Sequence, residues 1–211
     1  SQAPNLFWRV LLREEICHYL NRRFSLSYDP KTEVLITVGG SEAIDDCIRA
    51  FVEEGDEVLI PEPCYVSYLP ITQLCGAKPV SIPTKEENQF RLTADELKAK
   101  ITDKTKILVL PYPNNPTGGV MEREHLEEIA KVLRGTDIIV LSDEIYAELT
   151  YGGHHVSSAS LEGMKERTIV INGFSKTYAM TGWRLGYACG PAEIIKQMTK
   201  IHQFAIMCAP T

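Results

Sequence analysis

Lys176 and Arg184 are the residues whose type and spacing point most directly to chemistry. They lie eight residues apart in the segment Asn172-Gly-Phe-Ser-Lys-Thr-Tyr-Ala-Met-Thr-Gly-Trp-Arg, in which most other residues are small or apolar. We expect Lys176 to be poorly solvated and close to a second cation, and both conditions favour its neutral amine. A neutral amine forms a Schiff base with an aldehyde, and a nearby arginine binds phosphate with two hydrogen bonds. The alternative is a strand-to-loop junction with a solvated lysine.

A glycine-rich turn, Gly39-Gly-Ser-Glu-Ala43, offers a candidate phosphate site. It follows an expected strand and opens an expected helix, whose first N–H groups and dipole favour an anion. The glycines let the backbone approach that anion closely, and Ser41 could add a hydroxyl donor. The alternative is that Ser41 is an ordinary helix cap.

Two further segments place polar or aromatic groups after expected strands. Tyr65 follows Pro61-Glu-Pro-Cys64 and could stack on a planar ring, or it could join Tyr68 in packing a helix onto the sheet. The loop Pro111-Tyr-Pro-Asn-Asn-Pro-Thr-Gly-Gly119 has a path constrained by its prolines and glycines. Its Asn115 could donate to a phenolate-like oxygen, and the alternative is a rigid turn.

Asp143 comes directly after the apolar run Asp137-Ile-Ile-Val-Leu141. A carboxylate at the end of a buried strand is costly unless it has a partner, and a pyridinium nitrogen is a suitable one. Tyr146 follows closely enough to reach an oxygen substituent of the same ring. The alternative is that Asp143 caps a following helix.

The elements that must position these groups alternate between strand and helix. We expect strands at 34–38, 57–60, 78–82, 107–110, 138–141, 168–171 and 185–189, and helices at 11–24, 41–52, 65–74, 94–100, 122–133 and 192–204. This order predicts a three-layer α/β/α domain with a mostly parallel central sheet. Ligands of such sheets bind at the carboxyl ends of the strands, where the candidate residues fall.

The composition, the net charge and the cysteine spacing narrow the classes of protein to which this chain can belong. The 211 residues are 44% apolar and 24% charged, which is typical of a globular protein. A net charge of -6 argues against general binding to nucleic acid or anionic membranes, and neither a membrane-spanning run nor a signal peptide is evident. The six cysteines form no CxxC pair, so we expect reduced, mostly buried thiols in a cytoplasmic protein. The adjacent pair His154-His155 is expected to be solvated, and no metal site is expected.

Taken together, these motifs closely resemble the class I aminotransferases among the fold-type I pyridoxal-phosphate enzymes. The motifs that carry the resemblance are Gly40-Ser-Glu-Ala43, Pro113-Asn-Asn-Pro-Thr-Gly118, Ser142-Asp-Glu-Ile-Tyr146 and the run from Gly173 to Arg184. The resemblance covers residues 12–211 and is most specific at the lysine segment and the asparagine loop. It implies the large domain of a fold-type I enzyme.

The resemblance also implies roles for individual residues. Lys176 would form a Schiff base with pyridoxal 5'-phosphate and later move the proton between substrate and cofactor. Asp143 would pair with the ring nitrogen, Tyr146 and Asn115 would hydrogen-bond the ring oxygen, and Tyr65 would stack on the ring.

The implied phosphate site combines the amides around Gly40, Ser41 and Glu42 with Arg184. Many relatives have a serine three residues before the lysine, where this sequence has Gly173. The resemblance therefore implies that Ser175, next to the lysine, would serve as a substitute phosphate ligand.

The resemblance implies transfer of an amino group from an L-amino acid, aspartate or an aromatic one, to a 2-oxo acid such as 2-oxoglutarate, in a homodimer. Residues 1–211 would form the large domain, without the N-terminal arm or the C-terminal small domain of the family. Two alternatives remain open: a C–S lyase or cyclopropane-acid synthase with the same cofactor, and a truncated cofactor-binding domain with little turnover.

Overall fold

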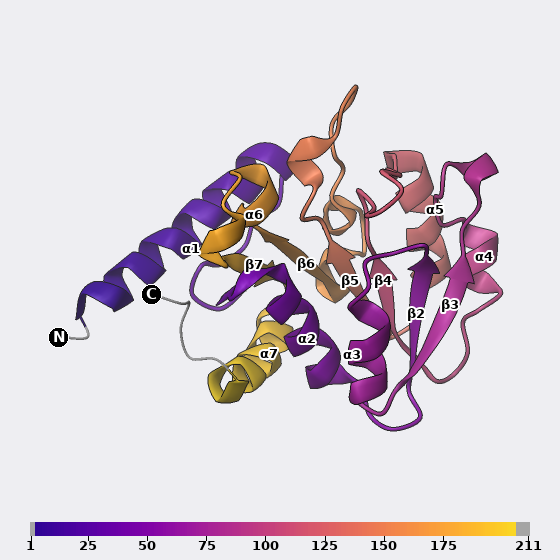
Figure 1. Cartoon of the computed structure of the whole chain (residues 1–211), viewed down its shortest axis with the longest axis horizontal. Helices are drawn as coiled ribbons and strands as arrows, with labels where there is room; N and C mark the ends of the chain where they lie inside the picture. The colour runs from indigo at the N-terminus through magenta and orange to yellow at the C-terminus, as the bar shows by residue number, and fades with distance from the viewer. Residues whose placement is uncertain (1–2, 206–211) are drawn as a thin grey trace.

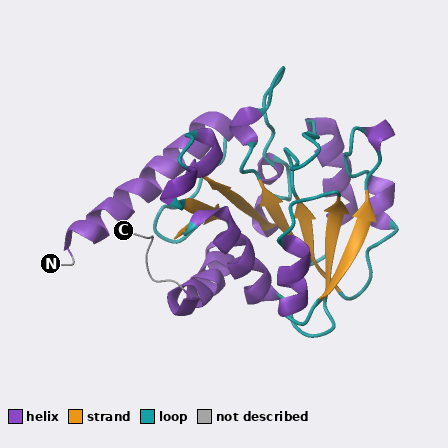
Figure 2. Ribbon diagram, viewed as in Figure 1, coloured by secondary structure: helices purple, strands orange, loops and turns teal. Residues whose placement is uncertain are grey.

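A seven-stranded sheet forms the centre of the chain, with the strand order β1-β7-β6-β5-β4-β2-β3. The structure, a computed structural model, describes residues 3–205. The strands are β1 (Val34–Thr37), β2 (Glu57–Glu62), β3 (Lys78–Pro83), β4 (Thr105–Leu110), β5 (Ile139–Asp143), β6 (Thr168–Gly173) and β7 (Gly186–Cys189). Figure 2 shows the sheet with helices packed around it.

Five neighbouring strands, β2 to β6, pair in parallel, which confirms the expected mostly parallel sheet. The pairs β2–β3, β2–β4, β4–β5 and β5–β6 are parallel, whereas β7 is antiparallel to both β1 and β6. The direction of β7 was not predicted. A parallel return from β6 would need a crossover helix, and the connection contains only single turns, α6 (Phe174–Thr177) and η5 (Thr181–Trp183).

Helices cover both faces of the sheet, as the sequence predicts. The helices α2 (Gly39–Phe51), α3 (Tyr68–Leu74) and α7 (Ala192–Ala205) share one apolar core with the sheet. The helices α1 (Ala3–Phe24), α4 (Ala94–Lys98) and α5 (Arg123–Leu133) pack in two further cores. Alternation along β4 connects the layers, because Ile107 and Val109 face the first core whereas Leu108 and Leu110 face another.

Several element boundaries differ from those predicted. Helix α1 begins at Ala3 rather than at residue 11, and α3 begins at Tyr68 rather than at residue 65. Strand β5 continues to Asp143, because its last residues still pair with β6. The segment after Asp143 forms a turn and the short 3-10 helix η2 (Ala147–Leu149), so Asp143 caps no α-helix.

The described cysteines are free thiols. Cys17, Cys47 and Cys189 are buried, Cys64 and Cys75 are partly buried, and Cys208 lies outside the described residues. No helix between residues 3 and 205 is long and apolar enough to cross a membrane.

The carboxyl ends of β1, β2, β4, β5 and β6 lie at one edge of the sheet. The parallel pairs align four of these strands, and β1 has the direction of β6 because both are antiparallel to β7. Figure 1 shows α6 at the end of β6 and the start of α2 near the same edge. The segments that carry the candidate residues therefore converge, as predicted.

Candidate functional site

A cavity of about 250 Å³ lies at this edge of the sheet. It gathers nine of the ten predicted site residues from five separate segments. These nine are Gly40, Ser41, Tyr65, Asn115, Asp143, Tyr146, Ser175, Lys176 and Arg184. The tenth, Glu42, is not among the lining residues, and its side chain turns instead toward α7.

Asp143 is the buried acid of this cavity. Its Oδ2 accepts a hydrogen bond of 2.6 Å from the Tyr68 hydroxyl, and its Oδ1 accepts one of 3.2 Å from the Ile145 backbone N–H. Burial raises the pKa of the Asp143 carboxyl, and these two hydrogen bonds oppose that rise. The carboxylate can therefore accept one more donor, preferably a cationic one, from the cavity.

Tyr68 is a further candidate residue of the site, although the sequence suggested only a packing role for it. Its ring is buried in the core, and its hydroxyl reaches Asp143 from α3. A tyrosine shortly after the end of a strand is a weak sequence signal for a site residue, since the sequence does not show which carboxylate its hydroxyl contacts. Tyr65 lies before α3, lines the cavity and packs edge-to-face on Tyr68 with ring centroids 5.8 Å apart.

Lys176 lies on α6, the single helical turn that follows β6. Its Nζ is 5.7 Å from the centroid of the Tyr146 ring, so the amine and the phenol share the cavity. The Lys176 side chain is exposed, and the expectation that it is poorly solvated is wrong. The physical reason is that one short turn at the rim of the cavity leaves the amine open to water.

Arg184 lies across the first turn of α2. It adopts a left-handed backbone conformation, with φ 49°, and its Nη1 donates to the Thr181 carbonyl oxygen at 3.1 Å. A Cβ at Gly39 would be 2.5 Å from Arg184 Nη2, so only glycine leaves room for the guanidinium. The guanidinium and the N–H groups of Gly40 and Ser41, at the start of the helix, are thus arranged as a candidate anion site, here called the anion cradle.

Ser175 and Ser41 add hydroxyl groups to the cavity from two sides. Ser41 Oγ is 3.4 Å from the Tyr65 hydroxyl. At Gly173 a Cβ would lie 2.9 Å from the Leu185 carbonyl oxygen and 3.0 Å from Gly186 Cα. The close approach of β7 explains why this position carries no side chain here.

The two neighbouring asparagines in the loop at residues 111–119, Asn114 and Asn115, have different environments. Asn114 is buried and structural: its Nδ2 donates to the Pro63 carbonyl oxygen, and its Oδ1 accepts from the Thr117 backbone N–H and hydroxyl. Asn115 is exposed and lines the cavity. Asn114 therefore fixes the loop from which Asn115 faces the cavity.

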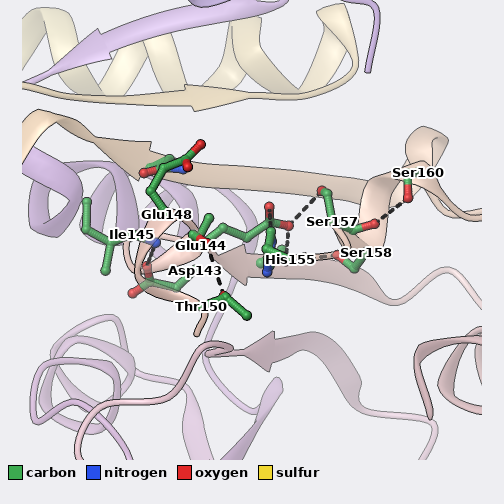
Figure 3. Close-up of polar contacts among 12 residues, drawn as sticks. Asp143, Glu144, Ile145, Glu148, Thr150, His155, Ser157, Ser158 and Ser160 are labelled. Carbon is green, nitrogen blue, oxygen red and sulfur yellow. Dashed lines mark hydrogen bonds and ion pairs between the residues drawn. The ribbon is translucent and has the colours of Figure 1, made fainter. Parts of the chain in front are cut away.

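Glu144 anchors the other side of β5 in a buried polar network (Figure 3). Its Oε1 accepts hydrogen bonds of 2.8 Å from Ser142 and Ser157, and its Oε2 lies 2.8 Å from His155 Nε2. His155 is only 8% exposed, so the expectation of a solvated side chain is wrong for it, whereas His154 is exposed. The network fixes the strand end that presents Asp143.

Comparison with known proteins identifies a matching family and relatives of this chain. The sequence model of the family "Aminotransferase class I and II" matches residues 4–211. The chain is 53% identical over 199 residues to the putative aminotransferase YugH of Bacillus subtilis, covering 94% of this chain and 52% of that protein. It is 48% identical over 201 residues to an aspartate aminotransferase of Pyrococcus abyssi, covering 95% of this chain and 52% of that protein.

A solved structure shows the same likeness in three dimensions. An aromatic aminotransferase from Pyrococcus horikoshii superposes with a TM-score of 0.92 at 48% identity, covering 95% of this chain and 54% of that one. The chain thus spans about half the length of the relatives that it matches.

Proposed function

We propose, from the premise that this chain belongs to the class I and II aminotransferase family, that it forms the cofactor-binding large domain of a pyridoxal-phosphate-dependent aminotransferase. The observation that carries the proposal is the cavity in which Lys176, Asp143 and Arg184 meet. The complete protein would move an amino group from an L-amino acid to a 2-oxo acid such as 2-oxoglutarate. Aspartate and aromatic amino acids are the proposed donors, because named relatives are aspartate and aromatic aminotransferases.

The lining residues fit the ring of pyridoxal phosphate. Asp143 is a buried carboxylate that can still accept a donor, which suits a protonated ring nitrogen. Asn115 and Tyr146 offer donors for the ring oxygen, and Tyr65 offers an aromatic face. Each of these groups has a counterpart on the cofactor.

The opposite side of the cavity fits the phosphate. The first turn of α2 contributes free N–H groups at Gly40 and Ser41, and Arg184 contributes a guanidinium. Ser175 supplies a further hydroxyl donor in place of the side chain that Gly173 lacks. This set of donors is typical of a phosphate site.

When bound, pyridoxal phosphate supplies an aldehyde that condenses with primary amines and a ring that withdraws electrons from the amino acid's α-carbon. Lys176 would hold the cofactor covalently when no substrate is present. Once released, its amine would act as the general base that takes the proton from the α-carbon of the substrate and delivers it to a carbon of the cofactor. Asp143 would keep the ring nitrogen protonated, and Arg184 would fix the phosphate so that the ring stays aligned with Lys176.

The proposal includes a homodimer in the cytoplasm. Tyr178 and Trp183, which lie between Lys176 and Arg184 in the sequence, are 54% and 67% exposed, and aromatic side chains of this kind are enriched at protein interfaces. The described free thiols suit a reducing compartment. A purely monomeric complete protein in light scattering would argue against the dimer.

Substitution of Lys176 tests the cofactor assignment. The complete protein with added pyridoxal phosphate should show the visible absorbance of lysine-bound cofactor, and Lys176→Ala should abolish that absorbance. Lys131→Ala, which alters an exposed lysine paired with Glu128 on α5, is the matched control and should keep it. If Lys176→Ala retains the band, the assignment of the lysine is wrong.

Product analysis tests the reaction. Incubation of the complete protein with aspartate or an aromatic amino acid and 2-oxoglutarate should yield glutamate, as transamination requires. In a parallel incubation with an amino acid that carries a C–S bond at its β-carbon, release of a thiol, pyruvate and ammonia without glutamate would instead identify an elimination of the C–S lyase type. Titration with individual amino acids would rank the donors.

A further inference from the structure

Glu42 and His202 connect the phosphate cradle to α7. Glu42 lies in the first turn of α2, where one carboxylate oxygen accepts a hydrogen bond from the Val38 backbone N–H. The other carboxylate oxygen lies 2.8 Å from Nδ1 of His202, near the end of α7. The two side chains are 8% and 16% exposed, so water screens this contact weakly.

A second carboxylate lies next to this pair. Asp46 is on the following turn of α2, is fully buried, and neither of its carboxylate oxygens has a hydrogen-bond partner among the described residues. Its Oδ2 is 4.0 Å from the same Nδ1 of His202. Burial and the charge of Glu42 raise the pKa of Asp46 to about 7, whereas His202 opposes that rise. His202 is therefore the basic group that faces both acids.

The position of Glu42 creates an electrostatic conflict. The same helical turn supplies Gly40 and Ser41 to the anion cradle, in front of which Arg184 lies. A phosphate there would approach the negative charge of Glu42, and like charges in a weakly screened site repel. Figure 1 shows α7 packed alongside α2, the arrangement that brings His202 to the first turn.

We propose that His202 is a positioning residue for the cofactor phosphate: it holds the Glu42 carboxylate against the start of α2 and offsets its negative charge. The inference rests on the proposed function, because it requires a phosphate-bearing cofactor in the cradle. His202 does not line the cavity, and its contact with Glu42 is the connection through which it would act on the cradle.

Comparison of two aldehydes tests whether the role is specific to phosphate. In the complete protein, His202→Gln should raise the dissociation constant of pyridoxal 5'-phosphate about tenfold, through uncompensated charge at the cradle. The dissociation constant of pyridoxal, which has the aldehyde and ring without the phosphate, should change less than about twofold. Equal weakening of both aldehydes, or no weakening of either, would overturn the proposal.

A double-mutant cycle isolates the partner. Glu42→Gln removes the charge but keeps an oxygen that can accept from the Val38 N–H. In the Glu42→Gln background, His202→Gln should therefore have little further effect on binding of pyridoxal phosphate. If His202→Gln weakened binding of pyridoxal phosphate equally in the wild-type and Glu42→Gln proteins, His202 would not act through Glu42.

Two more variants test whether poor folding, or the loss of any histidine, explains the result for His202→Gln. His202→Lys places a cation within reach of Glu42 and should restore much of the affinity lost in His202→Gln. This recovery tests the proposal even if the glutamine variant folds poorly. His18→Gln changes an exposed histidine that contacts Glu15 on α1 and should leave affinity unchanged. Failure of the wild-type protein to attach cofactor at Lys176 would refute the proposed function itself, whereas normal attachment with an unresponsive His202 would refute only this inference.

Discussion

Two acidic residues follow each other at the end of β5 and meet opposite environments. Asp143 turns toward α3 and the cavity, where Tyr68 donates to it. Glu144 turns to the other face, where two serines and His155 satisfy it. The alternation of a β-strand alone separates a carboxylate that is available to a ligand from one that holds the scaffold.

Tyr68→Phe should shift the pH dependence of the reaction. The hydroxyl of Tyr68 stabilises the ionised form of Asp143, so its removal raises the pKa of Asp143 beyond the rise that burial already causes. A higher pH is then needed to ionise the carboxyl, and the acidic limb of kcat/KM should move to higher pH. The loss of one hydrogen bond should also cost about 1 kcal/mol of stability.

The control for this substitution is Tyr28→Phe. Tyr28 is also buried, and its hydroxyl has no hydrogen-bond partner among the described residues. Its removal should leave the pH profile of kcat/KM in place. A profile for Tyr68→Phe that coincides with the wild type would contradict the role given to this hydroxyl.

Individual site residues were predictable to the extent that their segments carry strong local signals. Lys176, Asp143 and Arg184 stand in motifs whose strand-to-loop position is readable from apolar runs and glycines, and the structure gathers them in one cavity. The roles of Tyr68 and His202 were not readable. Each depends on which elements pack against each other. The contact of Tyr68 with Asp143 spans 75 residues and that of His202 with Glu42 spans 160, and such distant contacts leave no local pattern.

At the scale of elements, the junction between β7 and α2 sets the shape of the anion cradle. A Cβ at Gly186 would lie 2.4 Å from the backbone carbon of Gly39, so strand and helix start are in direct backbone contact. Gly39 itself has φ +76° and leaves room for Arg184. The strand order was not predictable from the alternating pattern, because the pattern specifies layers but not which strands become neighbours.

Gly39→Ala should weaken binding of the cofactor selectively. The new methyl group would displace the Arg184 guanidinium, and the dissociation constant of pyridoxal phosphate should rise about tenfold or more, as expected for a disturbed charge-assisted contact. The strained left-handed backbone should also cost about 1 kcal/mol of stability. Equilibrium binding and thermal denaturation of the complete protein measure the two effects separately.

Gly135→Ala supplies the matched control. Gly135 has φ +75°, nearly the same backbone conformation, but no atom lies within 4 Å of its added Cβ. It should lose similar stability and no cofactor affinity. Equal losses of affinity in both variants would mean that backbone strain, and not the displacement of Arg184, governs the cradle.

At the scale of the whole molecule, buried acids make stability depend on pH. The Asp46 carboxyl has its ordinary pKa of 3.8 in the unfolded chain, whereas burial raises its pKa in the folded chain to about 7. Below pH 3.8 both states hold the proton, so ionisation does not favour unfolding. As pH rises through this window, the unfolded state ionises first, and the fold loses stability until pH reaches about 7.

Asp46→Asn should remove this dependence, because an amide does not ionise. The stability of the variant relative to wild type should therefore increase between pH 4 and pH 7, by about 2–4 kcal/mol in total. Denaturation curves of the complete protein at several pH values measure the change. A difference that stays constant over this range would show that Asp46 is not protonated in the folded state.

The alternation at Asp143 and Glu144 also constrains how this chain can change by insertion and deletion. Losing or gaining one residue within β5 would exchange the faces of all residues beyond the change, which would turn Asp143 away from the cavity and Glu144 toward it. The exposed turn at residues 151–154 has no alternation of side-chain faces to preserve, so it tolerates a change in length far better. Among variants of this chain, we therefore expect length differences to accumulate in that turn while β5 keeps its residue count.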